Sequence, residues 1–144
     1  MKDIKYVLLG LVLVGHMTIT SCGEDSTESV ILGTWLGTNI VRSGCSDPLD
    51  NGDLECKRDL SECVSCMTLV LGRDGTYSLT ANFDGSPNSE TGDFEAKDGK
   101  IRLDPSNGDP YDLPVSDVSE SDMIIDLPLS NGCSAKISLE STDC

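Results

Sequence analysis

Hydrophobic and polar residues alternate along this chain in short runs, and the alternation predicts β-strands. Residues 67–71 and 76–81 are two such runs on either side of Asp74-Gly75, and a pair of β-runs across an Asp-Gly turn is the strongest short-range signal for a hairpin. Residues 92–96 and 100–103 flank Asp98-Gly99 in the same way. No segment has a convincing helical period, so the pattern predicts an all-β protein.

The remaining strands complete an antiparallel meander of about eight. They are predicted at residues 30–36 with 39–41, at 111–115 and 123–127, and at 134–139. Pro114 and Pro128 each remove a donor from a strand ladder, so we expect bulges or an edge at these strands. This is the physical argument for a sheet that closes incompletely.

Residues 44–62 are rich in Asp, Gly, Ser and Cys and are predicted to form a long loop, in which residues 59–62 make one helical turn. Loops of this length inside a compact domain are often pinned or functional. One hypothesis is a weak calcium site, because oxygen-bearing side chains cluster there: Asp47, Asp50, Asn51, Asp53 and Glu55. The register of an EF-hand fails, since Leu49 and Arg58 stand where ligands belong, and a solvated turn is the other interpretation.

The N-terminal segment has the pattern of an export signal. Lys2 and Lys5 precede an apolar run of about nine residues, too short for the ~20 that span a bilayer as a helix. The sequence Ile19-Thr20-Ser21-Cys22 resembles the lipobox of bacterial lipoproteins. The resemblance implies removal of residues 1–21 and acylation of Cys22, with an ordinary signal peptide as the alternative.

An acidic run at residues 22–29 is predicted to be a flexible tether for a single domain at 30–144. Acidic residues directly after the lipidated cysteine also resemble the surface-export signal of lipoproteins in the Bacteroidota. We therefore expect a lipid anchor in the outer membrane, on its periplasmic face or at the cell surface.

Charge and composition exclude several classes of function. Without residues 1–21 the chain has 8 basic and 24 acidic residues, a formal charge of −16 over 123 residues, which disfavours nucleic acid as a partner. The single histidine, His16, lies in the predicted signal peptide, so Ser-His-Asp catalysis, Cys-His catalysis and imidazole ligation of a metal are excluded. We expect neither an enzyme nor a cofactor; a surface hydrolase built on two carboxylates is a weaker hypothesis.

Six cysteines remain after Cys22, and an even set in a small exported domain predicts three disulfides among 15 connectivities. They are Cys45, Cys56, Cys63, Cys66, Cys133 and Cys144. The Cys63–Cys66 spacing also fits a redox pair, or a four-thiolate zinc site with Cys45 and Cys56. An oxidising compartment favours disulfides over both.

Three motifs in order are similar to small lipocalin-like lipoproteins of the Bacteroidota. They are Gly33-Thr34-Trp35, then Leu69-x-Leu71-x-x-Asp74-Gly75-Thr76-Tyr77, then Gly92-x-Phe94 with Gly99-x-Ile101-x-Leu103. The resemblance implies an eight-stranded up-and-down barrel with Trp35 at its closed end and a small hydrophobic ligand inside.

The inward candidates for ligand contact are Trp35, Leu69, Leu71, Tyr77, Phe94 and Ile101, which a self-filled barrel would instead use as core. A second function of a different class is a protein-interaction or inhibitor module that acts through the 44–62 loop.

Acylation is tested by intact mass analysis of the protein purified from its own membrane. We expect a chain that begins at Cys22 and carries fatty acid, and a Cys22→Ser variant that carries none and leaves the membrane fraction. A chain with a bare residue 22 would exclude the anchor.

Overall fold

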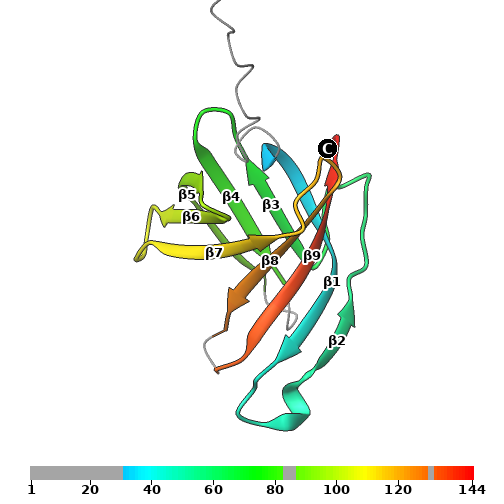
Figure 1. Cartoon of the computed structure of the whole chain (residues 1–144). Helices are drawn as coiled ribbons and strands as arrows, with labels where there is room; N and C mark the ends of the chain where they lie inside the picture. Colours follow the sequence, from blue (N-terminus) through cyan, green and yellow to red (C-terminus); the bar gives the residue numbers. More distant parts are fainter. Residues whose placement is uncertain (1–30, 83–86, 130–131) are drawn as a thin grey trace, which may run out of the picture.

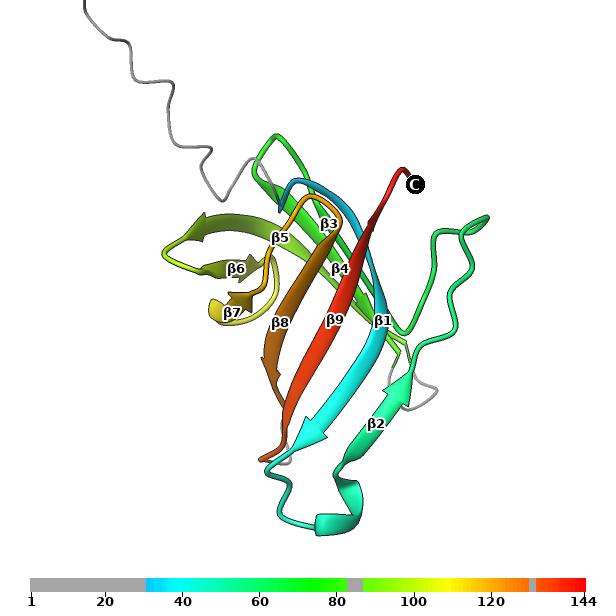
Figure 2. The same cartoon turned by 45° about the vertical axis from the view of Figure 1, so that its right-hand side comes forward.

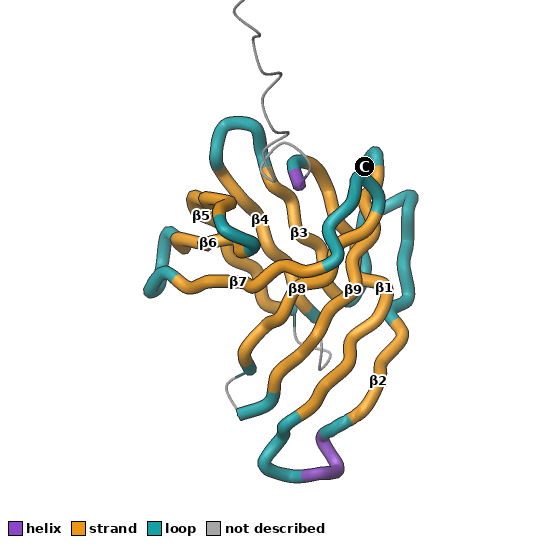
Figure 3. The backbone as a smooth tube through the Cα atoms, in the orientation of Figure 1, coloured by secondary structure: helices purple, strands orange, loops and turns teal. Residues whose placement is uncertain are grey.

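The computed structural model describes residues 31–82, 87–129 and 132–144; the predicted signal peptide, Cys22 and the tether lie outside these ranges. Nearly all of the regular structure within them is antiparallel sheet (Figures 1 and 3). The strands are β1 (Gly33–Ser43), β2 (Gly52–Glu55), β3 (Met67–Leu71), β4 (Thr76–Ala81), β5 (Asn88–Lys97), β6 (Lys100–Pro105), β7 (Tyr111–Ser116), β8 (Asp122–Pro128) and β9 (Ser134–Thr142).

Eight of these strands form a closed barrel. Each strand from β3 to β8 pairs with the next along the chain, β1 pairs with β3, and β9 returns to pair with β1. The up-and-down barrel is therefore confirmed, and the expectation of incomplete closure is wrong. The barrel closes despite Pro114 because β7 pairs with β8 only after the proline, through Val115↔Ile125 and Ser116↔Ile124. The hydrogen-bond donor that proline lacks is therefore not needed by this ladder.

The two predicted hairpins form at the Asp-Gly turns. Asp98 and Gly99 both have positive φ, 54° and 72°, as a two-residue type I′ turn requires, and they join Lys97 to its partner Lys100. Gly75 has a φ of 81° in the turn between β3 and β4. Short-range turn chemistry thus fixes the register of both hairpins.

Alternate residues of the barrel strands point inward and form one hydrophobic core. The Trp35 side chain is fully buried, and its Nε1 donates a hydrogen bond to the Ile31 carbonyl at 2.7 Å, which satisfies the polar end of the ring. The other fully buried large side chains of this core are Ile31, Met67, Leu69, Leu71, Ile101, Leu103, Leu113, Met123, Ile125 and Ile137. Leu36, next to Trp35 on β1, is also fully buried but is not part of the core cluster.

β1 is longer than the barrel strand beside it. Its first residues pair with β3 and its later residues, from Asn39 to Arg42, pair with β2. Figure 2 shows β1, β9 and β2 continuing beyond the start of β3 as an extension of the barrel wall.

The extension corrects the prediction of a long loop at residues 44–62. That segment contains a 3-10 turn at Pro48–Asp50 and the strand β2. The helical turn expected at residues 59–62 is also wrong, because Asp59 and Val64 exchange backbone hydrogen bonds of 2.9 and 3.1 Å around a tight turn.

Neighbouring residues of β3 provide a stability test. Leu69 is fully buried, whereas Val70 points outward and is 36% exposed. We expect Leu69→Ala to lower the free energy of unfolding by about 2–5 kcal/mol through lost burial and a residual cavity. Val70→Ala is the control, with a change of about 0.5 kcal/mol or less, and equal losses in denaturant titrations of the two variants would contradict the assigned facing of β3.

Candidate functional site

The residues predicted to line a ligand cavity lie together inside the barrel. Trp35, Leu69, Leu71, Tyr77 and Ile101 are buried members of the core, and Phe94 is a half-buried side chain packed against it. They contact one another as parts of a single cluster, so they act as core side chains in this structure. A small barrel of eight strands can be filled in this way.

One polar group projects into the barrel among these apolar side chains. The pairs Leu79↔Glu90 and Leu103↔Tyr111 place Glu90 and Tyr111 on the inward face. The Glu90 carboxylate accepts a hydrogen bond from the Tyr77 hydroxyl at 3.0 Å and another from the Tyr111 hydroxyl. Tyr77 pairs with Gly92 of β5. A Cβ at residue 92 would overlap the backbone of Asp104 in β6, so the close approach of β5 to β6 requires glycine at this position.

The cluster changes the acid–base behaviour of both phenols. Burial, followed by the hydrogen bond and the negative charge of Glu90, raises the pKa of Tyr77 and of Tyr111 well above the usual value. Both hydroxyls therefore remain protonated at neutral pH. Each donates a hydrogen bond to the Glu90 carboxylate, which points into the barrel.

The pockets lined by described residues include one on the outer face of the barrel wall. It has a volume of about 640 Å³, lies over β3 to β6 and is lined by Val70, Thr76, Thr91 and Asp93 among others. A smaller one of about 180 Å³ adjoins Glu90 and is lined by Ser89, Thr91 and Asn107.

A second candidate site is the segment 44–66, which we call the braced segment because all three disulfides hold it. Cys45 is joined to Cys133 before β9, Cys56 to Cys66 before β3, and Cys63 to Cys144 after β9. Their Cα–Cα distances are 4.1, 5.3 and 5.7 Å. The three predicted disulfides are thus present, and Cys63 and Cys66 belong to different bridges rather than to one redox pair.

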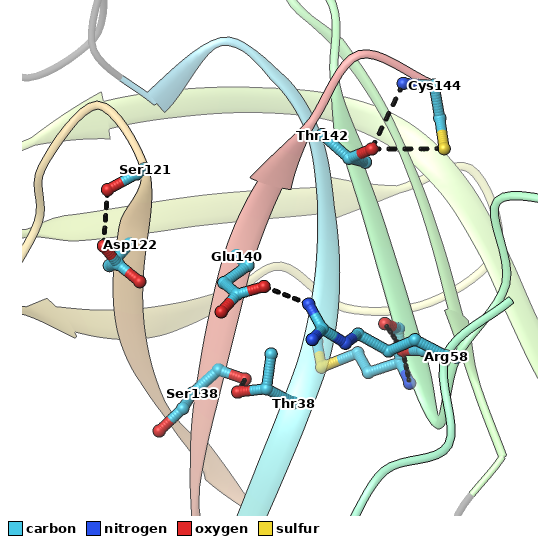
Figure 4. Close-up of polar contacts among 10 residues, drawn as sticks. Thr38, Arg58, Ser121, Asp122, Ser138, Glu140, Thr142 and Cys144 are labelled. Carbon is cyan, nitrogen blue, oxygen red and sulfur yellow. Dashed lines mark hydrogen bonds and ion pairs between the residues drawn. The ribbon is translucent and has the colours of Figure 1, made fainter. Parts of the chain in front are cut away.

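The later part of the braced segment crosses the outer face of the barrel. Arg58 forms an ion pair with Glu140 of β9 (Figure 4). Nearby, Asp59 Oδ1 accepts hydrogen bonds from the Ser61 amide at 2.9 Å and the Ser61 hydroxyl at 2.5 Å. These bonds hold the pKa of Asp59 below its usual value and fix the turn that presents Leu60.

Apolar side chains are exposed mainly on this segment. Seven large hydrophobic side chains are exposed among the described residues; Leu49, Leu54, Leu60 and Val64 lie in the braced segment, and Val41 lies on the adjacent part of β1. Leu49 is 90% exposed and Leu60 is 63% exposed. Four of the seven exposed apolar side chains therefore belong to one segment that three disulfides hold in place.

Two of the oxygen-bearing residues considered for calcium take part in the local fold. Asp47 caps the 3-10 turn by accepting from the Leu49 amide at 2.9 Å, and Asn51 accepts from the Cys45 amide at 3.1 Å. Across residues 31–82, 87–129 and 132–144, no group of three or more His, Cys, Asp or Glu side chains is placed to hold a metal ion.

Sequence reasoning missed Glu90, Tyr111 and β2. Glu90 lies in a polar stretch that resembles a turn, and β2 is a four-residue strand with every residue exposed, so neither has an apolar pattern. One signal was available for the cluster: Tyr77 and Tyr111 are the only tyrosines after residue 21, and a buried tyrosine hydroxyl needs a partner.

Together these features define a small up-and-down β-barrel with a core-filled interior and a disulfide-braced outer segment. Lipocalins are up-and-down β-barrels as well. Within the described part of the chain, no helix is both long enough and apolar enough to span a bilayer. No family model and no curated protein matches the sequence.

Similar solved structures include a lipocalin-like protein from Bacteroides uniformis, with 14% identity, a TM-score of 0.49, and coverage of 78% of this chain and 99% of that one. An uncharacterized protein from Bacteroides eggerthii has 12% identity, a TM-score of 0.48 and coverage of 77% and 98%. A redesigned β-barrel has 15% identity, a TM-score of 0.51 and coverage of 84% and 100%. The last likeness supports the barrel fold and, at this identity, the fold alone.

The tyrosine cluster is tested by ultraviolet titration of a chain that begins at residue 22, in which every tyrosine signal comes from Tyr77 and Tyr111. The unfolded chain should titrate near the ordinary value of about 10, and the folded chain at higher pH. Because folding raises the pKa of both tyrosines, their contribution to the free energy of unfolding is fully present below the pKa of tyrosine in the unfolded chain. It decreases as the pH rises above that value.

Glu90→Gln removes the neighbouring charge and should lower both folded pKa values towards normal. Glu95→Gln, on the exposed face of the same strand, is the matched control. Folded and unfolded chains that titrate together would contradict the cluster.

Proposed function

We propose that this protein is a lipid-anchored surface module that binds a positively charged protein through the braced segment. The observation that carries the proposal is the concentration of exposed leucine and valine side chains on a segment fixed by three disulfides. Pre-ordering of a binding surface lowers the entropy lost on association. An exposed apolar group on such a surface therefore contributes more to affinity than one on a mobile loop.

The direction of β1 supports this role. The described chain begins at Ile31 beside the start of β1, and the tip of the braced segment follows the end of the same strand. An 11-residue strand extends about 35 Å. With an anchor at Cys22 and a short tether, the tip around Leu49 would be the part of the extension farthest along β1 from the attachment point.

Charge indicates the chemistry of the partner. The braced segment has six acidic and two basic residues, on a protein with a formal charge of −16 once residues 1–21 are removed. A basic partner would be drawn to it by long-range attraction and then bind its apolar side chains. The long-range component should weaken as salt is added.

Binding of a small hydrophobic ligand inside the barrel is the second candidate, favoured by the barrel fold itself. The core side chains that such a ligand would contact already contact one another. A ligand would have to displace them, so we rank this function below the protein-binding one.

The experiment uses the full-length lipidated protein in the cells that make it, with a photo-reactive residue at position 60 and, as the control, at position 118. Val118 is also exposed and lies outside the braced segment. We expect one recurrent basic protein to be cross-linked from position 60 and not from position 118. Absence of an adduct from position 60, together with a co-purifying small molecule in native mass spectra, would favour the barrel interior instead.

A further inference from the structure

The strand β2 has an unused edge. Within the described ranges it pairs with β1 alone, and it is the terminal strand in the order of the sheet. All four of its residues are exposed. The barrel strands have neighbours on both sides, whereas β2 has a neighbour on one side only.

The register shows which backbone groups the edge presents. Asn39 pairs with Glu55, and the Cys56 amide donates to the Thr38 carbonyl at 3.0 Å, so Asn39 and Glu55 form a non-hydrogen-bonded pair. Such pairs alternate with hydrogen-bonded ones along an antiparallel ladder. The N–H and C=O groups of Leu54 therefore point to β1, and those of Asp53 and Glu55 point to the open edge.

We propose that this edge accepts an extended basic segment of a partner as an added β-strand. Backbone hydrogen bonds to Asp53 and Glu55 would supply the pairing, as in other cases of β-strand addition. The two side chains project from the same face of β2, so lysine or arginine at every second position of the partner would lie opposite them. This inference names the binding mode for the proposed function and rests on it.

Charge argues against a second copy of the chain as the occupant. A symmetric pairing of two β2 strands would bring Asp53 and Glu55 of one copy close to the same carboxylates of the other. Like charges across a strand pair are destabilising, and each copy has a large net negative charge. A basic strand removes both penalties.

The disulfides keep the edge available in a fixed position. Cys56–Cys66 ties the end of β2 to the start of β3, and Cys45–Cys133 ties the turn before β2 to the start of β9. β2 is too short to remain ordered by its own four residues. The two bridges hold it against β1 without covering its other side.

The probe is a six-residue peptide of alternating lysine and valine, compared with the same peptide in which glutamate replaces lysine. By NMR we expect the lysine peptide to shift the amide signals of Asp53 and Glu55 and to slow their hydrogen exchange by about tenfold near saturation. The glutamate peptide should do neither. Shifts confined to Leu49 and Leu60 would overturn strand addition.

Asp53→Pro removes an outward N–H while leaving the bonds between β2 and β1 in place. We expect about fivefold weaker binding of the lysine peptide, the size of one lost hydrogen bond, beyond any loss seen in Asp53→Asn, the control that keeps the N–H and removes the charge. Equal binding by the two variants would overturn the proposal. Concentration-dependent dimerisation of the wild-type chain in sedimentation would also overturn it, since a second copy would then occupy the edge.

The two proposals fail in different ways. If the cross-link from position 60 persists at full yield in Asp53→Pro, the proposed function stands and strand addition is wrong. If the wild-type protein gives no cross-link while the lysine peptide still binds β2, the proposed function is wrong and the edge remains a peptide site.

Discussion

The ladder between β1 and β9 is the interaction on which the rest of the structure depends. It runs from Thr34↔Thr142 to Ser43↔Ser134 with one irregularity between Gly37 and Asn39. It joins the first and last strands, so every barrel strand acquires two neighbours and the inward side chains are enclosed. It also continues past the start of β3, and the same pairing therefore supports the extension on which β2 forms.

The disulfides stabilise the parts of the chain that the core does not reach. The barrel interior contains one tryptophan and few other aromatic side chains, and most of its fully buried side chains are leucine, isoleucine and methionine. The braced segment, by contrast, buries little beyond Cys56 and is exposed at most positions. Its order comes from covalent bonds and from caps such as those of Asp47 and Asp59.

The barrel could be predicted because its signals are local. Asp98-Gly99 can adopt the paired positive φ values of a tight hairpin, and the alternation at Lys100 to Leu103 fixes which face is buried. Closure could not be predicted from Pro114. The effect of its missing N–H depends on where the ladder between β7 and β8 ends, and that ladder includes only the two residues after the proline. The Glu90 cluster and β2 were missed for a related reason: their partners are distant in sequence, and their own residues are polar.

The arrangement of bridges has a consequence for a protein exposed to proteases. Residues 46–55 lie between Cys45, which is bonded to Cys133, and Cys56, which is bonded to Cys66. A peptide bond cut at the prominent Leu49 would therefore leave both new ends covalently attached to the barrel. The tip can be nicked and still remain on the molecule, so a single cleavage changes its shape without shedding it.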